Sequence, residues 1–172
     1  MRRGNAVRVV GPLHWVVYPA LACLVATWIL GTPVRFFTLP MPEPIFPFVL
    51  AFAWPLIRPS LLGPIALFVL GMFTDFFHGG PAGLWTLSLL GVYALVLFAR
   101  PFIIGQEIRV LLAWYVGATS GAFLFAYLFV MLDVQVAPSL MAVFLQLLPT
   151  LLLFPLAAMM VDRFDDGDVR FR

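Results

Sequence analysis

The sequence predicts an all-α integral membrane protein in which residues 1–172 form one membrane domain, a bundle of six transmembrane helices. The first observation is composition: 63% of the residues are hydrophobic, 10% are charged, and the mean hydropathy is +1.07. A soluble domain carries roughly 25% charged residues to cover its surface. The surface of this chain must therefore face an apolar medium, and its many apolar residues also exclude disorder.

The second observation is the spacing of the charged residues. A membrane helix needs about 20 mostly apolar residues, because it must satisfy its own backbone hydrogen bonds across about 30 Å of hydrocarbon. Apolar runs between charges predict five helices, at approximately 13–30, 60–77, 82–99, 109–131 and 138–160. We expect Pro19 to bend the first of these helices, and Pro149 and Pro155 to bend the last.

The third observation is the distribution of arginines, which decides whether a sixth segment spans. The apolar run between Arg35 and Arg58 is short, 45–57, and prolines flank it. If this segment spans, every arginine except Arg35 falls on one side, which is the positive-inside pattern. If it does not, the arginines are split between the two sides. We therefore predict a further helix at about 42–57 and place both termini in the cytoplasm.

The amino terminus permits another interpretation. Basic residues followed by an apolar run resemble a signal peptide, and a lipoprotein reading would make Cys23 the lipidated residue. However, the run continues to Leu30, so a retained first helix fits its length better. Cys23 is the only cysteine and offers neither a disulfide nor a cysteine-based metal site. The pI of about 9.1 does not indicate nucleic acid, because the arginines are scattered and form no basic stripe.

Asp75 is the acidic residue embedded in an apolar run, and His78 follows one turn later. Such residues within a membrane helix are functional candidates. Three readings stay open: solvation near the outer interface, a structural bond to the turn amides of Gly79 and Gly80 or to His78, and proton coupling or catalysis. A negative charge near a helix C-terminus opposes the macrodipole, so we expect a specific partner for Asp75. No second histidine completes a metal site beside His78, and no catalytic motif, metal or cofactor is predicted.

Two stripes of small residues are candidates for helix packing. One lies in the fifth predicted helix, at Ala113, Gly117 and Gly121, and a weaker one lies in the first, at Ala22 and Ala26. Packing within the bundle is the preferred reading, and contact with another protein is the alternative.

Residues 42–90 carry a family resemblance. A proline-rich start leads into a short apolar run with Trp54 that ends at Arg58-Pro59, and Gly71-x-x-x-Asp75 and the turn 79–84 (Gly-Gly-Pro-Ala-Gly-Leu) follow. In this order the segment resembles the MreD family, the small membrane subunit of the bacterial rod-shape machinery. The acidic residue that the family carries near the start of its second helix corresponds to Glu43, placed slightly early. Outside 42–90, length, helix count and short loops support the resemblance.

The resemblance implies a non-catalytic subunit of the inner membrane, similar in fold to the six-helix substrate-binding subunits of vitamin importers. The implied partners are MreC, the glycosyltransferase RodA with its penicillin-binding transpeptidase, membrane lipid and, indirectly, MreB filaments. It also implies structural or partner-docking roles for Arg58, Pro59, Gly71, Asp75, His78, Gly79, Gly80, Pro81 and Gly83.

Two other classes of function are weighed against this one. A small-molecule importer subunit would need a ligand cavity, which Tyr93, Trp114 and Tyr115 could line. A membrane enzyme would use Asp75 together with His78.

Overall fold

The structure is a computed structural model that describes residues 8–11, 13–30, 35–36, 39–40, 43–135, 138–165 and 169–171. Arg2, Arg3, Pro42 and Arg172, which the sequence argument uses, lie outside the described residues. The helices are α1 (Tyr18–Leu30, preceded by a π-helical turn, Leu13–Val17), α2 (Pro47–Ile57), α3 (Leu62–His78), α4 (Leu84–Ile103), α5 (Ile108–Val134), α6 (Leu140–Leu151) and α7 (Phe154–Asp165). Two short strand pairs complete it: β1 (Arg8–Val10) with β4 (Val169–Phe171), and β2 (Arg35–Phe36) with β3 (Leu39–Pro40).

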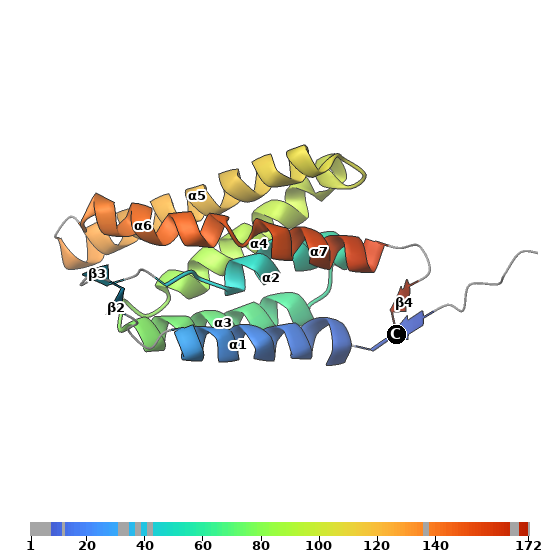
Figure 1. Ribbon diagram of the computed structural model, residues 1–172, viewed down its shortest axis with the longest axis horizontal. Coiled ribbons are helices and arrows are strands. Elements are labelled where there is room, and N and C mark those ends of the chain that lie inside the picture. Colours follow the sequence, from blue (N-terminus) through green and yellow to red (C-terminus); the bar gives the residue numbers. More distant parts are fainter. Residues whose placement is uncertain are drawn as a thin grey trace, which may run out of the picture.

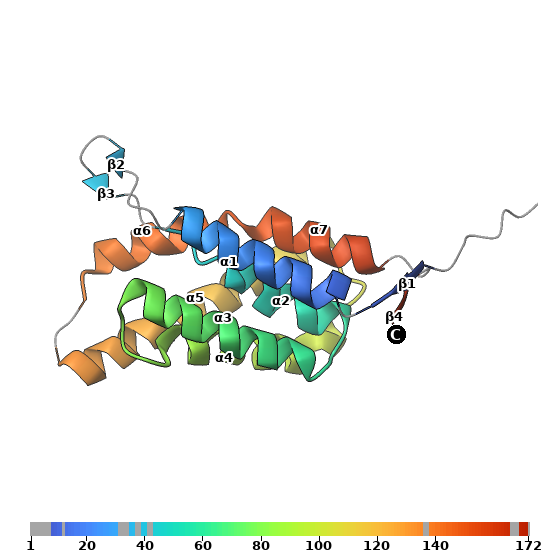
Figure 2. The ribbon, with the colours of Figure 1, turned by 90° about the horizontal axis from the view of Figure 1, so that it is seen from below.

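The helices lie along one long axis, and successive connections alternate between its two ends (Figures 1 and 2). One end, which we call the terminal end, holds the β1–β4 pair and the α2–α3 and α4–α5 connections. The other, the hairpin end, holds the β2–β3 pair and the α3–α4 and α5–α6 connections. Helices α6 and α7 follow one another along the same line.

Three helical segments are long and apolar enough to cross a membrane: Leu84–Ile103, Ile108–Asp133 and Leu140–Phe164. The apolar segments His14–Leu30, Pro47–Ile57 and Leu62–His78 are shorter. Large apolar side chains are exposed on the outside of the bundle, as at Phe76 (89%) and Phe98 (83%). Polar residues such as Thr119 are buried, whereas these large apolar side chains are exposed. An outer surface of this kind suits contact with lipid, so the protein is a membrane protein.

Helix α2 is the centre of the bundle. Every residue from Pro47 to Leu56 is buried, and the helix packs chiefly against α4 and α7. A helix that is apolar on all faces belongs in such a position. The predicted helix 42–57 begins later, at Pro47, and the amide of Ile45, just before the helix, donates to the Thr150 hydroxyl (3.1 Å). Pro47 lies in the first turn, where its missing N–H is of no consequence.

Pro19 shapes the start of the first helical segment. It has no N–H to offer the carbonyl of Trp15, four residues earlier. That carbonyl instead accepts a hydrogen bond from the indole Nε1 of Trp54 (2.9 Å). The chain passes from the π-helical turn into α1 just before Pro19. A buried polar atom freed by a proline is thus satisfied from α2, and the bond ties α1 to the core.

The predicted bend in the last helix is a break between α6 and α7, at Leu152 and Leu153. Pro155 falls in the first turn of α7, so its missing N–H lies where the helix has just been interrupted. At the end of α6 the carbonyl of Thr150 accepts a hydrogen bond from the hydroxyl of Tyr115 on α5 (2.9 Å).

Candidate functional site

Asp75 lies in the last turn of α3, and its side chain is 3% exposed. Its carboxylate accepts four hydrogen bonds, all from the N-cap and first turn of α4. Oδ1 accepts from the amide of Trp85 (2.6 Å), and Oδ2 accepts from the amides of Gly83 (3.0 Å) and Thr86 (3.3 Å) and from the Thr86 hydroxyl (2.7 Å). All four partners donate, which is the arrangement that an ionised carboxylate needs.

The first turn of a helix leaves N–H groups without partners inside the helix, and it carries the positive end of the helix dipole. The residue at the N-cap of α4 is Gly83, which has no side chain to accept them. Asp75 supplies the missing acceptor from a neighbouring helix, so one carboxylate caps α4 and locks it to α3. The observed partners correct the prediction for this residue, because they are Gly83, Trp85 and Thr86 rather than the amides of Gly79 and Gly80.

The turn between these helices uses glycine where the backbone demands it. Gly79 ends α3 with φ +62° and Gly83 precedes α4 with φ +94°, both in the left-handed region that favours glycine. Gly80 is exposed and Pro81 is half-buried between them.

Gly71 allows α3 and α4 to approach closely beside the Asp75 cap. A Cβ atom built at Gly71 would lie 2.4 Å from the Cα of Thr86, a separation that side chains do not tolerate. Gly63, further along α3, faces Tyr93 of α4 in the same way, at 3.0 Å. The hydroxyl of Tyr93 donates to the Ser60 carbonyl (3.1 Å), which cannot accept a bond from Pro64 four residues later because proline has no N–H. Small residues on one helix and polar anchors on the other thus hold this helix pair together.

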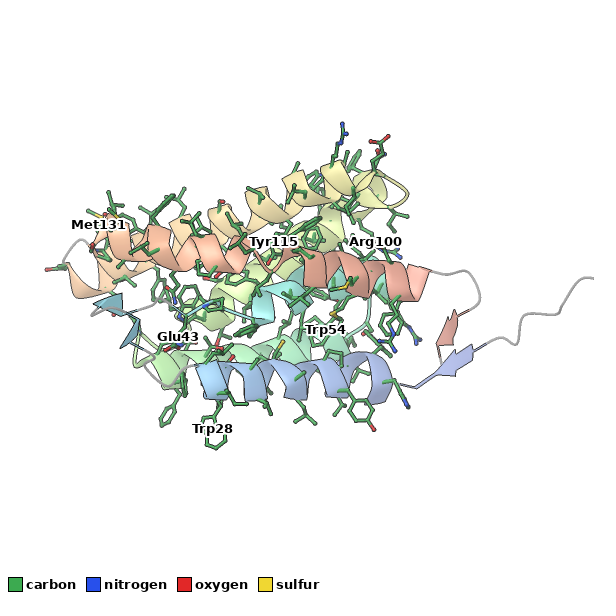
Figure 3. All side chains as sticks on the ribbon, in the orientation of Figure 1. Trp28, Glu43, Trp54, Arg100, Tyr115 and Met131 are labelled. Carbon is green, nitrogen blue, oxygen red and sulfur yellow. The ribbon has the colours of Figure 1, made fainter. Side chains whose placement is uncertain are left out.

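His78 joins the corner from the side. Its Nδ1 donates to the carbonyl of Thr74 (2.9 Å), so Nε2 is directed away from its own helix. Nε2 lies 3.7 Å from a carboxylate oxygen of Glu43, the residue that precedes the chain leading into α2. The Glu43–His78 pair is only partly buried and links that chain to the end of α3 at the hairpin end, where Figure 3 labels Glu43.

Arg58 and Pro59 lie apart from this corner. They follow α2 at the terminal end, and the Arg58 guanidinium is 6.0 Å from the ring centroid of Trp15. The structure therefore brings Gly71, Asp75, His78 and Gly83 together and leaves Arg58 and Pro59 at the opposite end.

The small-residue stripes do not lie where the sequence suggested. Gly117 and Gly121 are exposed on α5, and a Cβ built at either would meet no described atom within 4 Å. The preferred prediction of packing within the bundle is therefore wrong at these two positions. Ala113 is exposed on the same helix face, while Ala22 and Ala26 line a groove between α1 and α7.

The aromatic residues considered for a ligand cavity have other roles. Tyr93 and Tyr115 are buried and bond backbone carbonyls, and Tyr115 packs edge-on against Phe52 at 5.2 Å between ring centroids (Figure 3). Trp114 lines a shallow groove on the outside of α5.

Chemically, the corner built around Asp75 is a structural clamp. Within the described part of the chain, no three histidine, cysteine or acidic side chains are grouped so that they could hold a metal ion. The sequence did contain the signal for the clamp, an acidic residue at the end of one apolar helix shortly before another begins.

No family model matches the chain, and neither a curated protein nor a solved structure matches it.

Proposed function

We propose that this chain is a non-catalytic scaffold of the bacterial cell-elongation machinery, a six-span protein of the MreD type that binds MreC and supports wall synthesis along the side of the cell. The observation that carries the proposal is the segment from Gly71 to Leu84. Its residues resemble the family motif, and in the structure they form one hydrogen-bonded corner between α3 and α4. A motif whose members contact one another fits a shared architectural role.

The geometry of the Asp75 carboxylate supports a scaffold over an enzyme. Both of its oxygens are engaged by α4 donors, so abstracting a proton from a substrate would require giving up the helix cap. His78 is directed toward Glu43 rather than toward an open cavity.

The path of the chain through α2 supports six spans. The helix has 11 residues, and Phe46 before it also has helical dihedral angles (φ −55°, ψ −38°), so this part rises about 18 Å. The non-helical residues 43–45 can add at most roughly 10 Å. Together they approach the thickness of the hydrocarbon core, about 30 Å. Non-helical backbone at membrane depth is tolerated only where protein surrounds it. Ile45 meets that condition, because it is 1% exposed and its amide bonds Thr150.

The arginines support the orientation. The described arginines at the terminal end are Arg8, Arg58, Arg100, Arg109, Arg163 and Arg170, and the one in the hairpin-end strand pair is Arg35. The terminal end is therefore cytoplasmic by the positive-inside rule, and the chain is a multi-pass protein of the bacterial inner membrane with both termini inside.

MreC would meet the outer surface of the α3–α4 corner rather than its motif residues. Gly71 and Asp75 are buried, whereas Phe76 is 89% exposed beside them and Gly79 and Gly80 are exposed at the turn. The buried motif holds the shape of this surface, and RodA with its transpeptidase and the MreB filaments join through the assembled complex.

Affinity purification in mild detergent from a rod-shaped host tests the proposal. MreC should co-purify with the wild-type chain, and Phe76→Ala should lower its recovery. Phe98→Ala is the matched control, since Phe98 is also 83% exposed but lies in the half of α4 nearer the terminal end. Depletion should make the cells round. Normal cell shape and normal side-wall synthesis after depletion would refute the proposal.

A further inference from the structure

A groove of about 420 Å³ runs between α1 and α7. Ala22, Cys23 and Ala26 form its α1 wall, Met159 and Arg163 belong to its α7 wall, and Val49 of α2 lies in its floor. In Figure 1 α7 lies above α2 and α1 lies below it. The two walls make little direct contact with each other, and the small side chains on α1 leave the space between them unfilled.

The lining of the groove has one charged group. Arg163 lies in the last turn of α7, where the groove reaches the terminal end, and its side chain is exposed. The other lining residues are apolar. An apolar slot with a cation at one end complements an amphiphile that has a hydrocarbon chain and an anionic head. A guanidinium also pairs with a phosphate through two parallel hydrogen bonds.

The length of the groove favours a lipid chain over a protein helix. Its lining extends from Pro19 to Ala26 on α1 and from Leu156 to Arg163 on α7, which is about 10 Å along either helix. A transmembrane helix of a partner would need a continuous surface of about 30 Å. One leaflet is about 15 Å thick, so the groove takes about two-thirds of the length of an acyl chain in a single leaflet.

We propose that this groove binds an acyl chain of an anionic phospholipid from the leaflet at the terminal end, with the lipid phosphate held by Arg163. The site goes beyond the proposed scaffold function and does not depend on it. The lipid would fill the space that separates α1 from α7 and hold the two helices at their observed spacing.

Native mass spectrometry of the detergent-purified full chain, mixed with equal amounts of phosphatidylglycerol and phosphatidylcholine, tests the site. We expect the wild type to retain one phosphatidylglycerol. Arg163→Gln should reduce that retention about fivefold, the ratio that one basic residue near an anionic surface provides. Arg109→Gln is the matched control, because Arg109 is exposed at the same end but does not line the groove.

A second variant and a second readout locate the lipid. Ala22 is exposed, so Ala22→Phe should fold and fill the groove, and retention of both lipids should fall. Cys23 is the only thiol of the chain and lines the groove, so phosphatidylglycerol should slow its alkylation by N-ethylmaleimide in the wild type and in Arg109→Gln. Equal retention by Arg163→Gln and Arg109→Gln, undiminished retention by Ala22→Phe, or an unchanged alkylation rate would each overturn the proposal.

Discussion

Replacing Asp75 with asparagine changes one of its two carboxylate oxygens into an amide donor. The remaining oxygen best occupies the place of Oδ2, where it keeps the three bonds from Gly83 and Thr86. The new NH₂ group then faces the amide of Trp85, which now donates to Oδ1 at 2.6 Å. Two donors meet, and the buried Trp85 amide loses its partner.

The cost of this change follows from two terms. A buried donor left without an acceptor costs about 1–3 kcal/mol. Loss of the negative charge from the positive end of α4 costs about 0.5–2 kcal/mol in a buried geometry. We therefore expect Asp75→Asn to destabilise the fold by roughly 2–5 kcal/mol, which corresponds to a fall in melting temperature of about 4–20 °C.

Thermal unfolding in detergent, followed by tryptophan fluorescence, measures the change. Hydrogen exchange at the Trp85 amide should accelerate at the same time, because that amide has lost its acceptor. Asp133→Asn is the matched control, since Asp133 is exposed near the end of α5 and should melt as the wild type does. A melting temperature for Asp75→Asn within about 2 °C of the control would show that the carboxylate does not cap α4.

Two further changes test the helix contacts. Gly71→Ala should lower the melting temperature through an overpacking cost of about 1–3 kcal/mol. Gly91→Ala is its control, because a Cβ at Gly91 has open space, and it should raise the melting temperature slightly. Equal effects of the two changes would refute the close approach at Gly71. Trp54→Phe should cost about 0.5–1.5 kcal/mol by removing the indole N–H that donates to the Trp15 carbonyl. In the Pro19→Ala background the Trp15 carbonyl regains a helical N–H, so Trp54→Phe should cost less there. A double-mutant cycle of unfolding free energies measures this coupling, and a cycle that shows no coupling would contradict the account.

The long helices could be predicted from sequence because charged residues are costly in hydrocarbon and therefore mark where helices end. The start of α2 could not be predicted in this way. The chain just before it is held by a hydrogen bond between Ile45 and Thr150, which are far apart in the sequence. Bends were predicted at Pro149 and Pro155, and the structure has a break just before Pro155, whereas Pro149 lies inside α6. The break could be predicted because the loss of a backbone donor is a local effect that needs no knowledge of the neighbours.

The candidate site was predictable as a place but not as a set of contacts. An acidic residue near a helix C-terminus needs a partner, which sequence reasoning expected for Asp75. The actual partners become neighbours only when α3 docks on α4 through Gly71. The sequence could not predict whether Gly117 and Gly121 face lipid or protein, since in a membrane helix the faces toward lipid and toward protein are both apolar.

The burial of α2 has a consequence for how the protein is made. During synthesis α2 leaves the ribosome before α4 and α7, the helices that enclose it in the finished fold. Until they arrive, α2 has only its smaller contacts with α1 and α3, and the Ile45 amide lacks the Thr150 hydroxyl that bonds it at membrane depth. The final position of α2 is therefore acquired after translation has passed α7. Topology reporters should accordingly be inserted after Arg58 in the full-length chain, because a truncation at that point would report a biosynthetic intermediate.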